Sequence, residues 1–259
     1  MLQKTVKSLE KGIDILFLFV QEKPYLSIEE ISLMAGLPKS TCYRFINTLK
    51  RTGLIELDPD VAKYKLGVRL LKLESAIRTS LDITKIALPY MQELTSISGE
   101  TAQLMVLSKD EVVCVERVEG PGVLRVMPDR GNVIGLHSGA SGKVIMAFLS
   151  DEEQDRIIKE KGLKQYTPNT ITDFDVLKKR LKEIRTLGYA ISYQEIYLDV
   201  MAVAAPIFDH KNRVRGSIGL AGPGERFSQD KINQMLNHVL KAASNITEKL
   251  GANIENLNK

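Results

Sequence analysis

Apolar residues in the first third of the chain recur at helical spacing, in segments separated by helix-breaking residues. Pro24 and Gly36 mark two of these breaks. Ser27, followed three residues later by Glu30, forms a capping box that opens a short second helix. An amphipathic first helix is predicted over residues 8–20. Its apolar face is wide enough to contact a partner chain as well as the core. Its stripe consists of Leu9, Ile13, Leu16 and Phe17, widened by Phe19 and Val20.

A third helix is predicted over residues 38–52, with one apolar face and one polar, basic face. Its apolar positions follow the i, i+3, i+4, i+7 spacing and are Cys42, Phe45, Ile46 and Leu49. No Asp or Glu occurs over residues 34–55, whereas a solvated helix usually mixes charges to gain i,i+4 pairs. The pattern favours a helix that lies on DNA over an ordinary solvated face. The polar face comprises Lys39, Ser40, Thr41, Tyr43, Arg44, Asn47, Lys50 and Arg51.

Two short strands, over residues 54–57 and 62–66, are predicted to follow as a hairpin. A hairpin directly after a basic helix is typical of the wing in a winged helix-turn-helix. Lys63 and Lys65 of this wing are placed to reach phosphate or the minor groove, which adds affinity but little sequence discrimination.

From residue 81 onward, helices and strands alternate without charge bias. Helices are predicted over residues 86–97, 141–149, 151–161, 173–187 and 228–250. Strands are predicted over residues 101–107, 112–118, 124–127, 189–193, 200–208 and 214–221. This pattern indicates an α+β domain whose antiparallel sheet carries helices on one side.

The order of these motifs resembles the IclR family of bacterial transcriptional regulators. In the N-terminal part the resemblance is carried by residues 36–44 and by residues 64–67 at the exit of the wing. In the C-terminal part it is carried by residues 99–101, 136–143, 167–170, 204–209 and 219–223. The resemblance implies a winged helix-turn-helix DNA-binding domain over residues 1–66, a linker helix over residues 67–80 and a GAF-like effector-binding domain over residues 81–259.

The resemblance also implies which positions contact double-stranded operator DNA and which contact a small-molecule effector. The DNA-binding positions are Ser27, Lys39, Ser40, Thr41, Tyr43, Arg44, Asn47 and Lys63. The effector positions are Ile134, Ala140, Ser141, Ser192, Val200, Ala202, Gly219 and Ala221. Family members that bind two- or three-carbon keto acids have polar side chains at several of the latter, so this chain is expected to prefer a larger or less polar ligand.

Charge and composition agree with a DNA-binding N-terminal domain and an effector-binding C-terminal domain. The chain is 44% hydrophobic and 26% charged, which is typical of a soluble globular protein. Its net charge of +4 lies entirely in residues 1–80, which hold 13 Lys and Arg against 9 Asp and Glu, while residues 81–259 hold 23 of each. A basic N-terminal part is expected where one domain meets a polyanion. The longest apolar run, residues 15–20, is too short for a membrane span, so a cytoplasmic protein is expected.

The Gly-rich segment 138–144 is the candidate for small-anion binding. It fails the phosphate-loop pattern because His137 and Val144 stand where Gly and Ser or Thr are required, and it fails the nucleophile-elbow pattern at Lys143. What remains is a turn that feeds a helix N-terminus, whose free N–H groups suit a carboxylate.

No motif for catalysis, a cofactor or a metal accompanies this turn. The three histidines, at positions 137, 210 and 238, have no metal-ligand spacing, and Cys42 and Cys114 fit buried apolar positions. Gln194, Glu195 and Asp199 are interpreted as a polar loop over a pocket mouth, with the role of Asp199 left open.

The sequence therefore predicts a DNA-binding transcriptional regulator rather than an enzyme, with repression favoured over activation and control by an organic-acid metabolite. A homodimer or homotetramer is expected, because the first helix offers more apolar surface than a three-helix domain buries. The alternative is a DNA-binding protein whose C-terminal domain only oligomerises or has an enzymatic activity.

Overall fold

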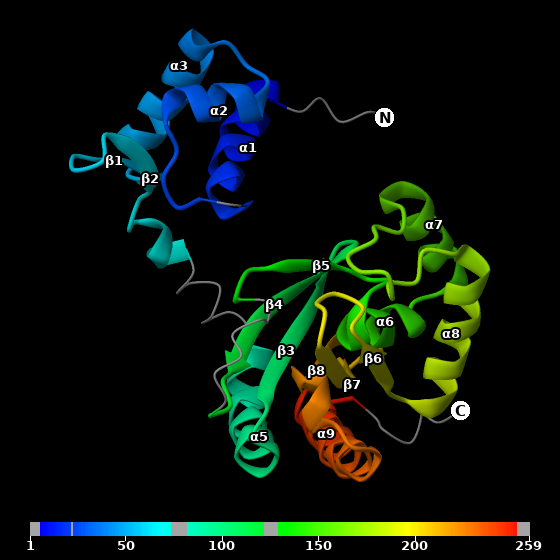
Figure 1. The fold of residues 1–259 in the computed structure, drawn as a ribbon. Helices are drawn as coiled ribbons and strands as arrows, with labels where there is room; N and C mark the ends of the chain where they lie inside the picture. Colours follow the sequence, from blue (N-terminus) through cyan, green and yellow to red (C-terminus); the bar gives the residue numbers. More distant parts are fainter. Residues whose placement is uncertain (1–5, 22, 74–81, 122–128, 253–259) are drawn as a thin grey trace. The chain divides into compact units, whose positions relative to one another are not determined.

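The computed structural model describes residues 6–21, 23–73, 82–121 and 129–252 (Figure 1). The chain divides into two compact units, Met1–Ser80 and Leu81–Lys259, which are treated separately here. No helix among the described residues is long and apolar enough to cross a membrane.

The N-terminal unit is a winged helix-turn-helix, as predicted. It contains α1 (Lys7–Gln21), α2 (Ile28–Ala35) and α3 (Lys39–Arg51), followed by the antiparallel strands β1 (Ile55–Asp58) and β2 (Lys63–Leu66). The capping box of α2 is present: Glu30 N donates to Ser27 Oγ at 3.2 Å, and Ser27 N donates to Glu30 Oε2 at 2.8 Å. The core consists of Ile15, Phe19, Leu26, Ile28, Ile31, Cys42, Ile46 and Ile55.

The core-facing side of α1 differs from the predicted stripe. Ile15 and Phe19 are buried, at 0% and 6% exposed, and Gly12 is buried beside them. A Cβ at Gly12 would lie 3.7 Å from Phe45 Cδ1, so the glycine forms the contact surface against α3. Of the wide apolar face predicted for α1, Leu16 and Phe19 pack on the core, whereas Leu9, Ile13, Phe17 and Val20 are exposed.

A further helix begins at Leu70 and continues to Leu73, where the described part of this unit ends. The rest of the predicted linker helix lies outside the described residues. The start of this segment is held to α3 because Arg69 Nη1 donates to the carbonyl oxygen of Thr52 at 2.6 Å.

The C-terminal unit is built on a six-stranded antiparallel sheet with the order β5-β4-β3-β8-β7-β6. Its strands are β3 (Thr101–Ser108), β4 (Glu111–Val118), β5 (Val133–Gly135), β6 (Ala190–Tyr193), β7 (Val200–Phe208) and β8 (Val214–Pro223). Its α-helices are α5 (Asp82–Ser98), α6 (Gly139–Ala147), α7 (Asp151–Lys161), α8 (Phe174–Leu187) and α9 (Gln229–Lys249), and a 3-10 turn spans Gly224–Arg226. The predicted strand over residues 124–127 falls on the undescribed residues.

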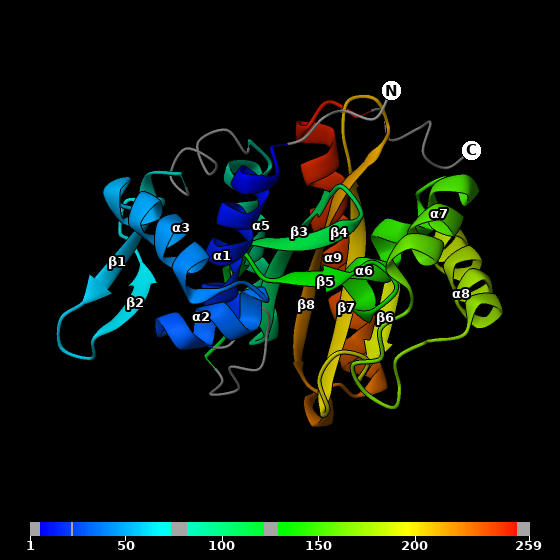
Figure 2. The same cartoon turned by 90° about the horizontal axis from the view of Figure 1, so that it is seen from above.

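Helices cover both faces of this sheet, which corrects the prediction that they lie on one side (Figures 1 and 2). One core joins the sheet to α5 and α9, and a second joins it to α6, α7 and α8. The physical reason is visible in the central strands. β7 and β8 are buried at nearly every position rather than at alternate positions, so each presents small or apolar residues to both faces.

Candidate DNA interface and candidate effector cavity

Helix α3 has the amphipathic character that the sequence predicts. Cys42 and Ile46 are fully buried, and Phe45 and Leu49 pack partly buried against the same core. Its first turn contains no acidic residue and its N-cap, Pro38, provides no side-chain acceptor. The exposed side is therefore basic, with Lys39, Ser40, Tyr43, Arg44, Asn47, Lys50 and Arg51 all exposed and Thr41 half-buried.

Two of the predicted DNA-contacting lysines are paired with carboxylates of α2. Lys39 Nζ lies 2.8 Å from Glu29 Oε1, and Lys63 Nζ of the wing lies 3.1 Å from Glu30 Oε2. Exposed pairs of this kind contribute ~0–1 kcal/mol, so a phosphate can replace either carboxylate. Ser27 has a structural role, since its hydroxyl oxygen accepts the Glu30 N–H in the capping box.

A cavity of about 40 Å³ opens between the sheet and the N-terminus of α6. All of the predicted effector positions except Gly219 line it. Gly219 lies in the sheet beside the cavity, and a Cβ there would come within 2.5 Å of the Val203 carbonyl oxygen, so the two strands are too close for a side chain. The lining residues are Gln103, Ile134, Gly139, Ala140, Ser141, Ser192, Glu195, Ile196, Tyr197, Val200, Ala202 and Ala221.

The N-terminus of α6 presents uncapped N–H groups to this cavity. Ser138 is the N-cap residue, but its hydroxyl donates to the carbonyl oxygen of Gly135 at 3.1 Å instead of capping the helix. The N–H groups of Ala140 and Ser141 lie in the first turn, where no acceptor exists within the helix. The arrangement suits a small anion, because the helix dipole adds partial positive charge at this end.

A buried ion pair forms one wall of the cavity. Glu195 lies in the loop after β6, and its carboxylate pairs with the ammonium group of Lys143 in α6, whose side chain is 1% exposed. The second oxygen, Glu195 Oε2, accepts the N–H of Gly139 at 3.1 Å. Burial lowers the pKa of Lys143, and the neighbouring Glu195 carboxylate acts in the opposite direction. Glu195 is thereby fully engaged in holding α6, which leaves the next two N–H groups free.

Two threonines fix the loop that carries Glu195. Thr167 Oγ1 donates to the carbonyl oxygen of Gln194, and Thr170 Oγ1 donates to that of Glu195, each at 2.6 Å. These threonines belong to the segment 167–170 that contributed to the family resemblance. The loop over the pocket mouth is therefore a rigid structural part rather than an acid–base centre.

Gln103 and Tyr197 line the cavity but were not predicted from the sequence. Gln103 lies in the middle of β3 among buried apolar residues, and Tyr197 follows Glu195 in the loop. In the sequence, Gln103 is the one polar residue of the apolar segment 102–107. Because its neighbours are all expected in the core, the sequence gives little indication that Gln103 lines a cavity.

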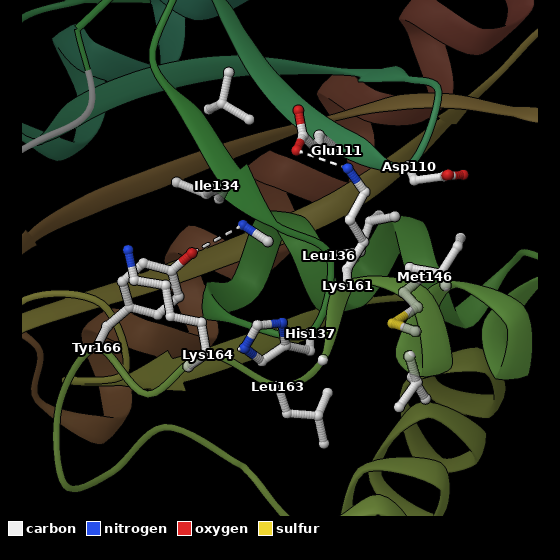
Figure 3. A pocket seen from close by; sticks show the side chains of 15 residues that line it. Asp110, Glu111, Ile134, Leu136, His137, Met146, Lys161, Leu163, Lys164 and Tyr166 are labelled. Atoms are coloured by element: carbon white, nitrogen blue, oxygen red, sulfur yellow. Dashed lines mark hydrogen bonds and ion pairs between the residues drawn. The ribbon is translucent and has the colours of Figure 1, made fainter. Parts of the chain in front are cut away.

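A larger cavity, of about 220 Å³, lies on the other side of β5 (Figure 3). Several of its polar groups are already paired within the protein. Lys161 Nζ lies 3.2 Å from Glu111 Oε1, and the Tyr166 hydroxyl accepts the N–H of Gly135 at 3.3 Å (Figure 3). The α6 cavity is smaller but offers unpaired donors, so it is the better candidate for an anionic ligand.

His137 borders this larger cavity and fixes the turn before α6. Its Nε2 lies 2.9 Å from the carbonyl oxygen of Lys164, and burial lowers its pKa. Within the described ranges, no group of three or more His, Cys, Asp or Glu side chains could hold a metal ion. Both cysteines are free and buried, and burial raises the pKa of Cys114 to about 11.

A basic, acid-free recognition helix in one unit and a cavity with uncapped N–H donors in the other define the class of one-component transcriptional regulators. Comparison with known proteins identifies the family. The model of the IclR helix-turn-helix domain matches residues 8–59, and the model of the bacterial transcriptional regulator IclR C-terminal domain matches residues 75–248. The chain belongs to the IclR family of bacterial transcriptional regulators.

Individual relatives match over almost the whole chain. The chain is 33% identical to the HTH-type transcriptional regulator KipR of Bacillus subtilis over 96% of its own length and 99% of that protein. It is 29% identical to the HTH-type transcriptional repressor AllR of Escherichia coli, over 96% and 92% of the two chains.

A solved structure shares the fold. It is an IclR homologue from Microbacterium hydrocarbonoxydans complexed with 4-hydroxybenzoate, with a TM-score of 0.81 and 23% identity over 94% of this chain and 98% of that one. Because its family and the relatives named above are transcriptional regulators, the chain is a DNA-binding transcriptional regulator and not an enzyme.

Proposed function

We propose that this regulator binds operator DNA through α3 and that a small organic acid, bound in the α6 cavity, changes its affinity for DNA. The observation that carries the proposal is the pair of uncapped N–H groups at Ala140 and Ser141, next to a wall that Lys143 and Glu195 hold in place. The related fold complexed with 4-hydroxybenzoate supports an aromatic carboxylate as one ligand that such a domain can hold.

The lining of the cavity supports the expected preference for a less polar ligand. Its floor carries Ala202 and Ala221, and Ser192 is the one side chain on β6 that adds a hydroxyl to the lining. The relative AllR, which is named as a repressor, supports repression as the mode of action. A regulator of bacterial operators would work in the cytoplasm.

The recognition helix is tested by replacing Arg44, which is exposed in the middle of its basic face. Arg44→Ala should weaken binding to the operator by roughly 5- to 150-fold, the equivalent of ~1–3 kcal/mol for a base or phosphate contact. Lys182→Ala removes a positive charge from the exposed side of α8 and serves as the matched control. If the two variants bind the operator with equal affinity in an anisotropy titration, the proposal that α3 contacts operator DNA is contradicted.

The effector site is tested by two changes at the same position. Ser141→Pro removes one N–H in the first turn of α6, where no helical hydrogen bond is lost, whereas Ser141→Ala keeps the N–H and removes only the hydroxyl. We expect an acid that shifts DNA binding of the parent protein to act on Ser141→Ala and not on Ser141→Pro. A normal response of the proline variant would contradict the site.

The competing function is a C-terminal unit that only oligomerises, which the apolar floor of the cavity favours. It predicts that no acid in a broad panel changes the thermal unfolding or the DNA affinity of the protein. A ligand-induced change of tenfold or more in DNA affinity would exclude it.

A further inference from the structure

One polar group of the cavity is left without a role by the proposed function. The side chain of Gln103 is 93% buried, since the residue is 7% exposed, and its Nε2 is buried without a hydrogen-bond partner among the described residues. Native structures rarely leave a buried amide N–H unpaired, because the lost hydration is not replaced. Gln103 lines the same cavity as Ala140 and Ser141.

The sheet register places Gln103 at one end of a floor of small residues. Gln103 pairs with Gly219 of β8, and in the next row of the same face Ala221 pairs with Ala202. Ala202 in turn pairs with Ser192 of β6. β3 and β6 are three strand spacings apart, or about 14 Å at a typical spacing of ~4.8 Å.

The first turn of α6 lies over this floor. Glu195, in the loop that follows β6, accepts the N–H of Gly139, and Ser217 Oγ of β8 donates to the carbonyl oxygen of Ser141 at 3.5 Å. This turn therefore extends over β8, the strand next to β3. A carboxylate held by Ala140 and Ser141 lies in the same cavity as the Gln103 amide, so the rest of the molecule can reach that amide.

We infer that Gln103 is the specificity-determining residue of the effector site and donates its Nε2–H to a hydroxyl or carbonyl oxygen of the effector other than its carboxylate. The effector class is thus a carboxylic acid with a second, uncharged oxygen acceptor. This inference rests on the proposed function, because it assumes that the carboxylate occupies the N-terminus of α6.

Such a residue selects chiefly by exclusion. An acid of the same shape that lacks this oxygen would fill the cavity, exclude water from the amide N–H and leave it unpaired. An acid with the oxygen satisfies the N–H. We therefore expect a preference of about tenfold or more for the oxygenated member of a matched pair.

The test uses the full chain and two matched pairs of acids, 4-hydroxybenzoate with benzoate and 4-oxopentanoate with pentanoate, measured by calorimetric titration. Gln103→Leu, which has a similar size and no donor, should reduce the preference within each pair to less than about twofold, chiefly by weakening the oxygenated acid. Thr84→Val is the matched control, since Thr84 Oγ1 is a second buried polar atom without a partner and lies outside the cavity lining. The control should keep the preference of the parent.

The outcomes separate the two proposals. An equal affinity for both members of each pair in the parent protein, or an unchanged preference in Gln103→Leu, overturns the role of Gln103 while the α6 site stands. If no acid binds the parent protein at all, the proposed function fails together with the inference. Gln103→Met is the second variant, because a thioether cannot donate, and it should lose the preference even if the leucine variant does not fold.

Discussion

At the scale of single residues, the buried lysine of α6 determines the shape of the effector cavity. Lys143 is 1% exposed, and a charge in such a place is retained only when it is paired and hydrogen-bonded. Its partner Glu195 bonds to Gly139 as well, so a single carboxylate joins the helix to the loop after β6. The position of the uncapped N–H groups therefore depends on this ion pair.

Removing one member of the pair should destabilise the protein strongly. Lys143→Met leaves the Glu195 carboxylate buried without its cation, and we expect the free energy of unfolding in urea to fall by roughly 3–5 kcal/mol. The double variant Lys143→Met, Glu195→Gln keeps an acceptor for the Gly139 N–H without any charge and should recover part of the loss. A double variant that is less stable than the single one would contradict this account.

His137 gives the C-terminal unit a defined sensitivity to acid. Because burial lowers its pKa below the ordinary value of ~6.5, the unfolded chain binds a proton there at a higher pH than the folded chain. This contribution to stability is complete above pH ~6.5 and is lost as the pH falls toward the folded pKa.

This sensitivity can be measured by comparing the free energy of unfolding of the parent with that of His137→Gln at different pH values. His137→Gln keeps a side-chain donor for the Lys164 carbonyl oxygen and does not titrate. The free energy of unfolding of this variant minus that of the parent should increase as the pH is lowered from 7.5 to 5, because only the parent loses stability at His137. A difference that is independent of pH in urea titrations would refute the assignment.

At the scale of elements, the boundaries and types of the helices were largely accessible from the sequence, whereas the face that each one buries was not. The capping box at Ser27, the stop at Gly36 and the cap at Ser228 are local hydrogen-bond patterns, and all three are present. The side of α1 that is buried carries Ile15 and Phe19, which pack in the core shared with α2 and α3. A hydrophobicity pattern alone does not determine which part of a wide apolar face is buried.

The arrangement of the sheet was likewise only partly predictable from the sequence. β5 spans three residues, Val133–Gly135, which is too short to produce an alternating pattern. Helices on both faces follow from the nearly continuous burial of β7 and β8, which a sequence of small residues suggests only weakly. The effector positions came from the family resemblance, and Gln103 was missed because a single amide in an apolar strand is read as part of the core.

The exposed stripe on α1 is the predicted surface for self-association. Leu9 and Phe17 are 63% and 62% exposed, two helical turns apart on one side of the helix. We propose a homodimer through this face, either alone or as half of a tetramer. Phe17→Glu should convert the dimer to a monomer in sedimentation velocity runs at micromolar concentration.

The control for this experiment is another exposed apolar residue of the same unit. Leu33 of α2 is 84% exposed and lies outside the stripe. Leu33→Glu should therefore leave the oligomeric state unchanged. Dissociation by both changes, or by neither, would assign the interface to another surface.

At the scale of the whole molecule, the proposed function requires a coupling between the two ligands rather than two independent activities. Regulation requires that the acid bind one DNA-binding state more tightly than the other. Coupling free energies of about 1–3 kcal/mol, corresponding to ~5- to 150-fold in affinity, are typical. Thermodynamic linkage makes this coupling reciprocal.

The reciprocal effect provides a test that needs no variant. The factor by which a saturating acid changes the operator affinity must equal the factor by which saturating operator changes the affinity for the acid. Calorimetric titration of the acid with and without a short operator duplex measures the second factor, and anisotropy measures the first. If both factors equal one, the acid does not control DNA binding.

The pairing of Lys39 with Glu29, and of Lys63 with Glu30, has a consequence for binding at different ionic strengths. A lysine that meets phosphate normally drives the release of a condensed cation, and log K falls with log salt by ~0.9 for each phosphate contacted. Here each lysine leaves a carboxylate behind, which takes up a cation in return. Operator occupancy should therefore depend less steeply on salt than the number of basic residues on α3 and its wing suggests.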